Sequence, residues 1–412
     1  MSNNTQPEIR FPGFMEDWEQ RKLGELAESF EYGLNASAKK FDGSNKYIRI
    51  TDIDDISHKF NQSGVTSPDI DFASADNYKL KKGDILFART GASVGKTYMY
   101  RESDGLVYYA GFLIRARIKS KISSEFVFQT TFTDSYNRFI KITSQRSGQP
   151  GVNAEEYSNF KIMIPNYEEQ NAIGCFFKKI DDTITLHQRK LDLLKETKKG
   201  FLQKMFPKNG AKVPEIRFPG FTGDWEQRKL GDVLTVSKEK NKSNSYSKEQ
   251  ILSVSREVGT VNQIEYQGRS FAGADISGYK IVYPGQLIYT KSPLKGAPYG
   301  IFQLVTEEGI VSPLYAVYNS TEQALASFIG LQLKSDNIAT HYLSPLVSKG
   351  AKNTINITDE GALDGRVTYP TITEQQKIVA FFKQLENTIT LHQRKLDLLK
   401  ETKKGFLQKM FV

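Results

Sequence analysis

The chain has 412 residues, which is long for a single core, and its 39% hydrophobic and 25% charged residues are typical of a folded protein. Lysine and arginine outnumber the acidic residues 56 to 47, and the net charge of +9 favours a polyanionic partner, nucleic acid before a membrane surface. The sequence also lacks an apolar run of membrane-spanning length and an apolar N-terminal stretch, which excludes a membrane span and a signal peptide. The only cysteine, Cys175, excludes an internal disulfide, so we expect a cytoplasmic protein.

The first element in chain order is a lead-in, PEIRFPGFMEDWEQRKLG, at residues 7–24. It returns at residues 214–231 with 16 of 18 positions identical. A basic segment, TITLHQRKLDLLKETKKGFLQKMF, occupies residues 183–206 and returns unchanged at residues 388–411. A solenoid needs a shorter period and more copies, so the repeats indicate two homologous domains with two spacers. The expected bounds are a first domain at 1–165, a first spacer helix at 166–206, a second domain at 207–370 and a second spacer helix at 371–412.

The two variable regions predict mixed α/β (α+β) domains. In the first region, KYIRITDI, GDILFAR, KTYMY and LVYYAGFLIRARI are rich in β-branched and aromatic residues and predict strands. A serine-capped helix is expected at SSEFVFQTTFTDSYNRFIKI. The second region predicts strands at EQILSVSREV, GQLIYTKS, GIFQLV and GIVSPLYAVY and a helix at ALASFIGLQLKSDNIATHYLSPLV. KKGDILF and YPGQLIY occupy corresponding places, each a turn followed by a strand.

Each variable region is followed by a predicted long helix. Steps of alternately four and three residues from Ile173 meet apolar residues at eight of ten positions, and steps from Ile378 do the same. Such a stripe can lie on the core of its own domain, but two near-identical stripes in one chain favour an antiparallel coiled coil with pseudo-two-fold symmetry. His187 and His392 fall on the seam, where we expect them to set the register; no cysteine or carboxylate cluster accompanies them to make a metal site. The outward faces would then be alike and could bind two copies of one partner protein.

Catalytic motifs are missing from the sequence. The Asn/Asp-Pro-Pro-aromatic signature of adenine methyltransferases is absent, and GASVGKT has one residue too few between its glycines for a phosphate-binding loop. We therefore expect a binding subunit rather than an enzyme, with no cofactor or metal of its own.

The doubled order of lead-in, domain closed by a P…EQ turn and long helix resembles the specificity subunit of Type I restriction–modification enzymes, HsdS, over residues 7–411. The resemblance implies two target-recognition domains that read unlike halves of a bipartite DNA target, with the paired helices setting the spacing. It also implies double-stranded DNA, two HsdM methyltransferase subunits and two HsdR subunits as partners, with S-adenosylmethionine in HsdM and ATP and Mg in HsdR. A coiled-coil scaffold that joins two proteins without reading DNA is the alternative.

DNA readout needs basic, amide and hydroxyl side chains on loops, and two stretches of each domain supply them at equivalent places. The predicted contacts in the first domain are Arg89, Thr90, Ser93, Lys96, Tyr98, Gln145, Arg146, Ser147, Gln149 and Asn153. Those in the second are Thr290, Lys291, Ser292, Lys295, Lys349, Lys352, Asn353 and Asn356. Ordinary polar loops remain the alternative for each single residue, whereas the recurrence in both repeats favours DNA contact by the stretches as a whole.

Overall fold

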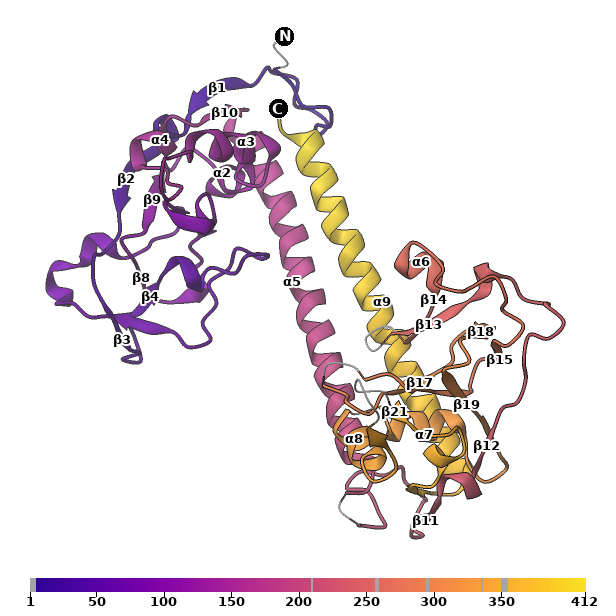
Figure 1. Ribbon diagram of the computed structural model, residues 1–412. Helices are drawn as coiled ribbons and strands as arrows, with labels where there is room; N and C mark the ends of the chain where they lie inside the picture. Colours follow the sequence, from indigo (N-terminus) through magenta and orange to yellow (C-terminus); the bar gives the residue numbers. More distant parts are fainter. Residues whose placement is uncertain (1–4, 209, 256–258, 294–295, 335, 350–354) are drawn as a thin grey trace. The chain divides into compact units, whose positions relative to one another are not determined.

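The computed structural model describes residues 5–208, 210–255, 259–293, 296–334, 336–349 and 355–412 (Figure 1). The chain divides into two compact units. The first consists of Met1–Leu191 and His392–Val412, and the second of Asp192–Leu391. Each unit therefore holds one mixed α/β domain together with half of each long helix.

The first domain is built on an antiparallel sheet with the strand order β2-β9-β6-β7. Its strands are β2 (Ala27–Tyr32), β9 (Leu113–Ile118), β6 (Asp84–Ala88) and β7 (Thr97–Met99). A second sheet has the order β3-β5-β4-β8, formed by β3 (Ala38–Lys40), β5 (Thr66–Pro68), β4 (Lys46–Ile48) and β8 (Val107–Tyr109). Every residue of β6 is buried because one face of the strand lies in each of two apolar cores, which explains its unbroken apolar sequence ILFA.

Three short helices, α2 (Ser124–Thr130), α3 (Asp134–Thr143) and α4 (Ala154–Ser158), contribute to the core on one face of this sheet. The single helix predicted over α2 and α3 is wrong. The Thr131 and Thr133 hydroxyls donate to the carbonyls of Phe128 and Thr130, both at 2.7 Å, and the Thr133 hydroxyl accepts from Tyr136 N to cap α3. The hydroxyls of Thr131 and Thr133 thus offer the backbone an alternative to the helical ladder. The helix predicted in the second domain is likewise two, α7 (Ala326–Gln332) and α8 (Asp336–Leu343).

The second domain repeats the first sheet as β12-β19-β16-β17. These strands are β12 (Leu234–Val236), β19 (Tyr315–Ser320), β16 (Leu287–Thr290) and β17 (Phe302–Leu304). Gly83 and Gly285 precede the central strands β6 and β16 with φ of 91° and 94°, so the correspondence of the two turns is confirmed. Paired strands complete the domain: β13 (Leu252–Ser255) with β14 (Gly259–Asn262), β15 (Lys280–Val282) with β18 (Gly309–Val311), and β20 (Ser348–Lys349) with β21 (Ile355–Asn356).

The long helices are α5 (Tyr167–Lys204) and α9 (Ile372–Met410), and they run antiparallel (Figure 1). In the first unit the start of α5 meets the end of α9, with the rings of Phe176 and Phe406 5.0 Å apart. In the second unit Phe201 and Phe381 make the same contact at 5.0 Å. Leu191 on the predicted seam is 1% exposed. The antiparallel coiled coil predicted from the heptad pattern is confirmed.

Polar residues in the seam pair with each other. The Nδ1 atoms of His187 and His392 are 3.3 Å apart, which places the two histidines opposite each other in the first unit. Lys403 pairs with Asp181 at 2.7 Å in the same unit, and Lys198 pairs with Glu386 in the second. A shift of one heptad would place His187 against Leu385 or Leu399 and would separate both ion pairs, so the pairs select a single register.

Each lead-in lies over one end of both helices. Arg10 donates through Nε and Nη2 to the two carboxylate oxygens of Glu169 in α5, both at 2.7 Å, while Ile9 N donates to Lys409 O in α9 at 2.9 Å. The second lead-in repeats these contacts with Arg217 on Glu374, again at 2.7 Å. The lead-in strands β1 (Glu19–Lys22) and β11 (Glu226–Lys229) pair with β10 (Lys161–Ile164) and β22 (Arg366–Tyr369), which directly precede the helices.

Candidate nucleic-acid interface

In the first domain the structure brings the two predicted DNA-contact stretches together. The loop after β6 pairs with the loop between α3 and α4: Gly91 N donates to Pro150 O at 3.0 Å, and Val152 N donates to Arg89 O at 2.9 Å. Thr90 and Gly151 form an isolated β-bridge at the same place. Residues 89–96 and 144–153 therefore form one surface, although residues 97–143 separate them in the sequence.

Two buried tyrosines hold this surface in place. The Tyr157 hydroxyl donates to Ala88 O at 2.7 Å and accepts from Gly95 N at 3.2 Å, and the Tyr136 hydroxyl donates to Gly95 O at 2.9 Å. Burial raises the pKa of both hydroxyls, so they stay protonated as donors. Sequence reasoning did not single out either tyrosine. The signal near Tyr157 was the preceding capping box of Asn153 and Glu156, which fixes the start of α4.

The loop of residues 145–153 presents five of the predicted contacts on its exposed surface: Gln145, Arg146, Ser147, Gln149 and Asn153. Arg146 donates to Thr143 O at 2.7 Å and pairs with Glu156 at 2.5 Å, so its guanidinium is held in one orientation. Asn153 accepts from Glu156 N at 2.8 Å as the cap of α4. Thr90 and Ser93 are half-buried in the neighbouring loop.

Some predicted contacts serve the interior instead. Tyr98 is 1% exposed and donates to Asp104 at 2.7 Å, and Thr290 is 4% exposed and accepts from Ile301 N at 3.0 Å. The prediction of DNA contact is wrong for these two side chains, because both lie within strands and point into cores. Lys96 is held by Asp55 and by Ile53 O, with its side chain 12% exposed.

The second domain presents its stretches after the equivalent elements, β16 and α8. Lys291 and Lys280 both pair with Asp359; burial opposes ionisation of this carboxyl, but the two lysines more than offset it and lower its pKa. Ser292 is exposed, and Asn356 is exposed in β21. Lys349 lies in β20, and its side chain is not among those described. Lys295, Lys352 and Asn353 lie outside the described residues.

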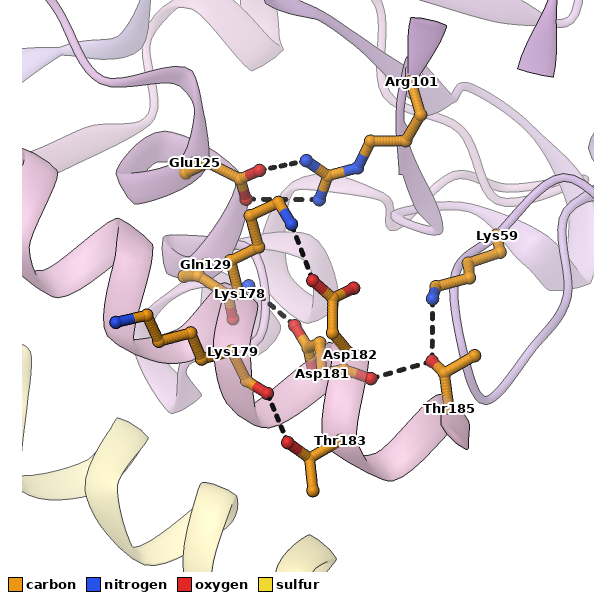
Figure 2. Close-up of polar contacts among 10 residues, drawn as sticks. All are labelled: Lys59, Arg101, Glu125, Gln129, Lys178, Lys179, Asp181, Asp182, Thr183 and Thr185. Atoms are coloured by element: carbon orange, nitrogen blue, oxygen red, sulfur yellow. Dashed lines mark hydrogen bonds and ion pairs between the residues drawn. The ribbon is translucent and has the colours of Figure 1, made fainter. Parts of the chain in front are cut away.

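Polar contacts fix the first domain to the first half of α5, within the first unit (Figure 2). Lys59 donates to the Thr185 hydroxyl at 2.7 Å, and Gln129 of α2 donates to Asp181 at 2.9 Å. Burial lowers the pKa of Lys59. Gly174 of α5 lets α2 approach closely, because a Cβ there would lie 2.8 Å from the Glu125 Cβ and 3.0 Å from Phe126 N. Domain and helix therefore form one body at this point.

Within the described ranges, no three histidine, cysteine, aspartate or glutamate side chains gather where they could hold a metal ion. The helices searched in those ranges include none long and apolar enough to cross a membrane.

Comparison with known proteins settles the family. The sequence profile of the Type I restriction modification DNA specificity domain matches residues 15–196 and again residues 222–401. The chain belongs to this family. As a Type I specificity subunit with two target-recognition domains, it agrees with the resemblance seen in the sequence.

Two relatives of the specificity subunit come from Methanocaldococcus jannaschii. The putative type I restriction enzyme MjaX specificity subunit is 24% identical over 419 aligned positions, which cover 95% of this chain and 92% of the relative. The MjaVIII specificity subunit is 23% identical over 232 positions, covering 54% and 50%. The crystal structure of the Type-I restriction-modification system S subunit from M. genitalium shares the fold, with a TM-score of 0.63 over 99% of both chains at 12% identity.

Proposed function

We propose that this chain is the non-catalytic, DNA-reading subunit of a Type I restriction–modification complex, and that its two domains read the two unlike halves of a bipartite target. The observation that carries the proposal is the repeated site: two equivalent sheets present polar, basic loops after β6 and β16. The loops differ in sequence while the lead-ins and helices that support them are nearly identical. Different side chains at equivalent places support recognition of different bases.

The paired helices set the spacing between the two half-sites. Their 38 and 39 residues are continuous helix, and the polar seam pairs select a single register. A spacer of fixed length and register supports recognition of half-sites about one turn of the duplex apart.

The outer helix faces dock two HsdM subunits. Leu186 and Leu193 are 66% and 67% exposed, lie seven residues apart on α5 and face away from Leu191 of the seam. Leu391 and Leu398 repeat this apolar stripe on α9, both 67% exposed. Exposed leucines at heptad spacing fit a partner helix, and two equal stripes fit two copies of one partner. HsdM would supply S-adenosylmethionine chemistry on adenine, and two HsdR subunits would add ATP and Mg, so the chain itself needs no cofactor.

Co-expression with HsdM, followed by mapping of methylated adenines in the host genome, tests this function. We expect one bipartite, asymmetric motif. Exchange of residues 25–165 for another variable region changes only one half of the motif. Insertion of four residues in each long helix, at equivalent places, changes the gap and leaves both half-sequences intact. The absence of methylation, together with no binding of duplex DNA with or without HsdM at low salt, would favour the protein scaffold instead.

A further inference from the structure

An arginine in the first domain lies between two exposed aromatic rings. The guanidinium carbon of Arg89 is 5.2 Å from the ring centre of Tyr32 and 5.8 Å from that of Phe112. Both distances are within the range of cation–π attraction. Tyr32 is 43% exposed and Phe112 is 59% exposed, so the three side chains together form a platform at the surface, which we call the Tyr32–Arg89–Phe112 platform.

The sheet explains why these three residues meet. Tyr32 ends β2, Phe112 directly precedes β9 and Arg89 directly follows β6, and these three strands are neighbours. Arg89 N donates to Phe112 O at 3.1 Å, which extends the β6–β9 ladder by one residue. Because side chains alternate along a strand, the three continue the face that carries Phe87 and Ile114, beyond the point where the core ends.

The platform is joined to the loops of the candidate interface. Arg89 O accepts from Val152 N at 2.9 Å, and the Tyr32 hydroxyl accepts from Ala154 N at 3.2 Å, just after Asn153. Arg89 Nε is buried and makes no hydrogen bond with any described group. The rings flank the guanidinium, and none of the described residues accepts a hydrogen bond from its two terminal nitrogens, which leaves these nitrogens as donors for a group outside the chain.

We propose that the Tyr32–Arg89–Phe112 platform enters the major groove and that Arg89 reads one guanine, through paired hydrogen bonds to O6 and N7, in the half-site of the first domain. The inference rests on the proposed function and names the specificity-determining residue within it. A planar fork of donors matches the two acceptors of guanine, which is the commonest specific arginine contact with DNA.

The surroundings of Arg89 favour a base over a phosphate. Arg89 is flanked by two rings that expose apolar surface, whereas the phosphate backbone offers them only charged and polar groups. Such rings fit the edges of bases, including the methyl group of thymine, and not the charged backbone. The equivalent position in the second domain is Lys291, which pairs with Asp359 and has no planar fork of donors, so the inference concerns the first half-site alone.

The test is methylome mapping of the full chain co-expressed with HsdM, with the variants Arg89→Lys and Arg89→Ala. Arg89→Lys keeps the charge and loses the planar fork. We expect it to cut the preference for one guanine by about 10-fold to 100-fold, with every other position of both half-sites unchanged. Arg89→Ala should give the same degenerate position with weaker methylation overall. Arg21→Ala, which removes an exposed arginine in the lead-in, should leave the motif as in the wild type.

Each outcome of this experiment either supports or overturns the inference about Arg89. Loss of discrimination at one guanine of one half-site supports the inference. An unchanged motif in Arg89→Lys overturns it, as does relaxation at a base other than guanine or at both half-sites. If Arg89→Ala is not folded, as shown by its thermal unfolding, Arg89→Lys alone decides. A wild-type chain that gives no bipartite motif removes the proposed function, and the inference with it, whereas a normal wild-type motif with an unaffected Arg89→Lys removes the inference alone.

Discussion

The buried ion pair between Arg10 and Glu169 predicts a large and local effect on stability. Glu169 is fully buried at 0% exposure, the Arg10 side chain is 11% exposed, and both carboxylate oxygens accept from the guanidinium at 2.7 Å. The hydrogen bond to Glu169 raises the pKa of Arg10, so the pair stays ionised. Arg10→Met removes the cation and leaves a buried carboxylate without its charge partner, which costs about 3 to 5 kcal/mol.

Calorimetric unfolding measures this cost. For a unit of about 200 residues, a loss of this size lowers the transition by about 6 to 20 °C. Arg217→Met should produce the same shift in the second unit, because Arg217 and Glu374 repeat the geometry at 2.7 Å with side chains 15% and 0% exposed. Hydrogen exchange of α5 and α9 assigns each shift to its unit.

A matched control separates burial from ion pairing as such. Arg21 and Glu19 also pair at 2.7 Å, but their side chains are 49% and 68% exposed, so Arg21→Met should cost less than about 1 kcal/mol. The double variant Arg10→Met with Glu169→Leu should recover most of the lost stability, since no unpaired charge remains. A cost for Arg10→Met as small as that of the control would refute the reasoning.

Two further predictions concern the long helices. Gly174→Ala should destabilise by about 1 to 3 kcal/mol, because its Cβ meets Glu125 and the backbone of Phe126, whereas Gly200→Ala, with nothing within 4 Å, should stabilise by about 0.5 to 1 kcal/mol in the same denaturant titration. Equal effects would contradict the close approach of α2. The pKa of His187 is lowered, first by partial loss of hydration and then by the nearby Lys395, His392 and Lys190, so the folded state favours the neutral imidazole. The contribution of His187 to the free energy of unfolding should therefore be fully present above about pH 6.5 and be lost as the pH drops through the folded pKa. The double variant His187→Asn with His392→Asn should flatten that pH dependence in melting curves.

The long elements were predictable and the short ones were not. A heptad pattern that continues for about four heptads is enough to place α5 and α9 within a few residues of their observed bounds. The breaks between α2 and α3 and between α7 and α8 were not predicted, because neither is marked in the sequence by a proline or a glycine. At Thr131 and Thr133 the side-chain bonds to the backbone decide the outcome, and composition does not reveal them.

The candidate site was predictable as stretches and not as side chains. Polar loops after equivalent strands indicated the segments that form this surface, but the pairing of residues 89–96 with 144–153 is a tertiary contact without a local signal. Tyr98 lies in KTYMY, which was predicted as a strand and yet was also chosen as a DNA contact; strand alternation turns its side chain into the core. Tyr32 and Phe112 were missed for the opposite reason, since aromatic residues in strands are normally counted as core.

The lead-in contacts give a physical reason for the near-identity of the repeated segments. In each unit the lead-in touches its own helix, as Arg10 touches Glu169, and the end of the other helical segment, as the ring of Trp18 touches the ring of Phe411. The C-terminal end of each long helix therefore packs against the lead-in of the other repeat. A substitution in a lead-in needs a matching substitution at the helix end that it contacts, which lies in the other repeat. The described contacts of the loops after β6 and β16 lie within their own domain, as Gly91 with Pro150 and Lys291 with Asp359, so the side chains of one loop can change without the other, as the proposed recognition of two unlike half-sites requires.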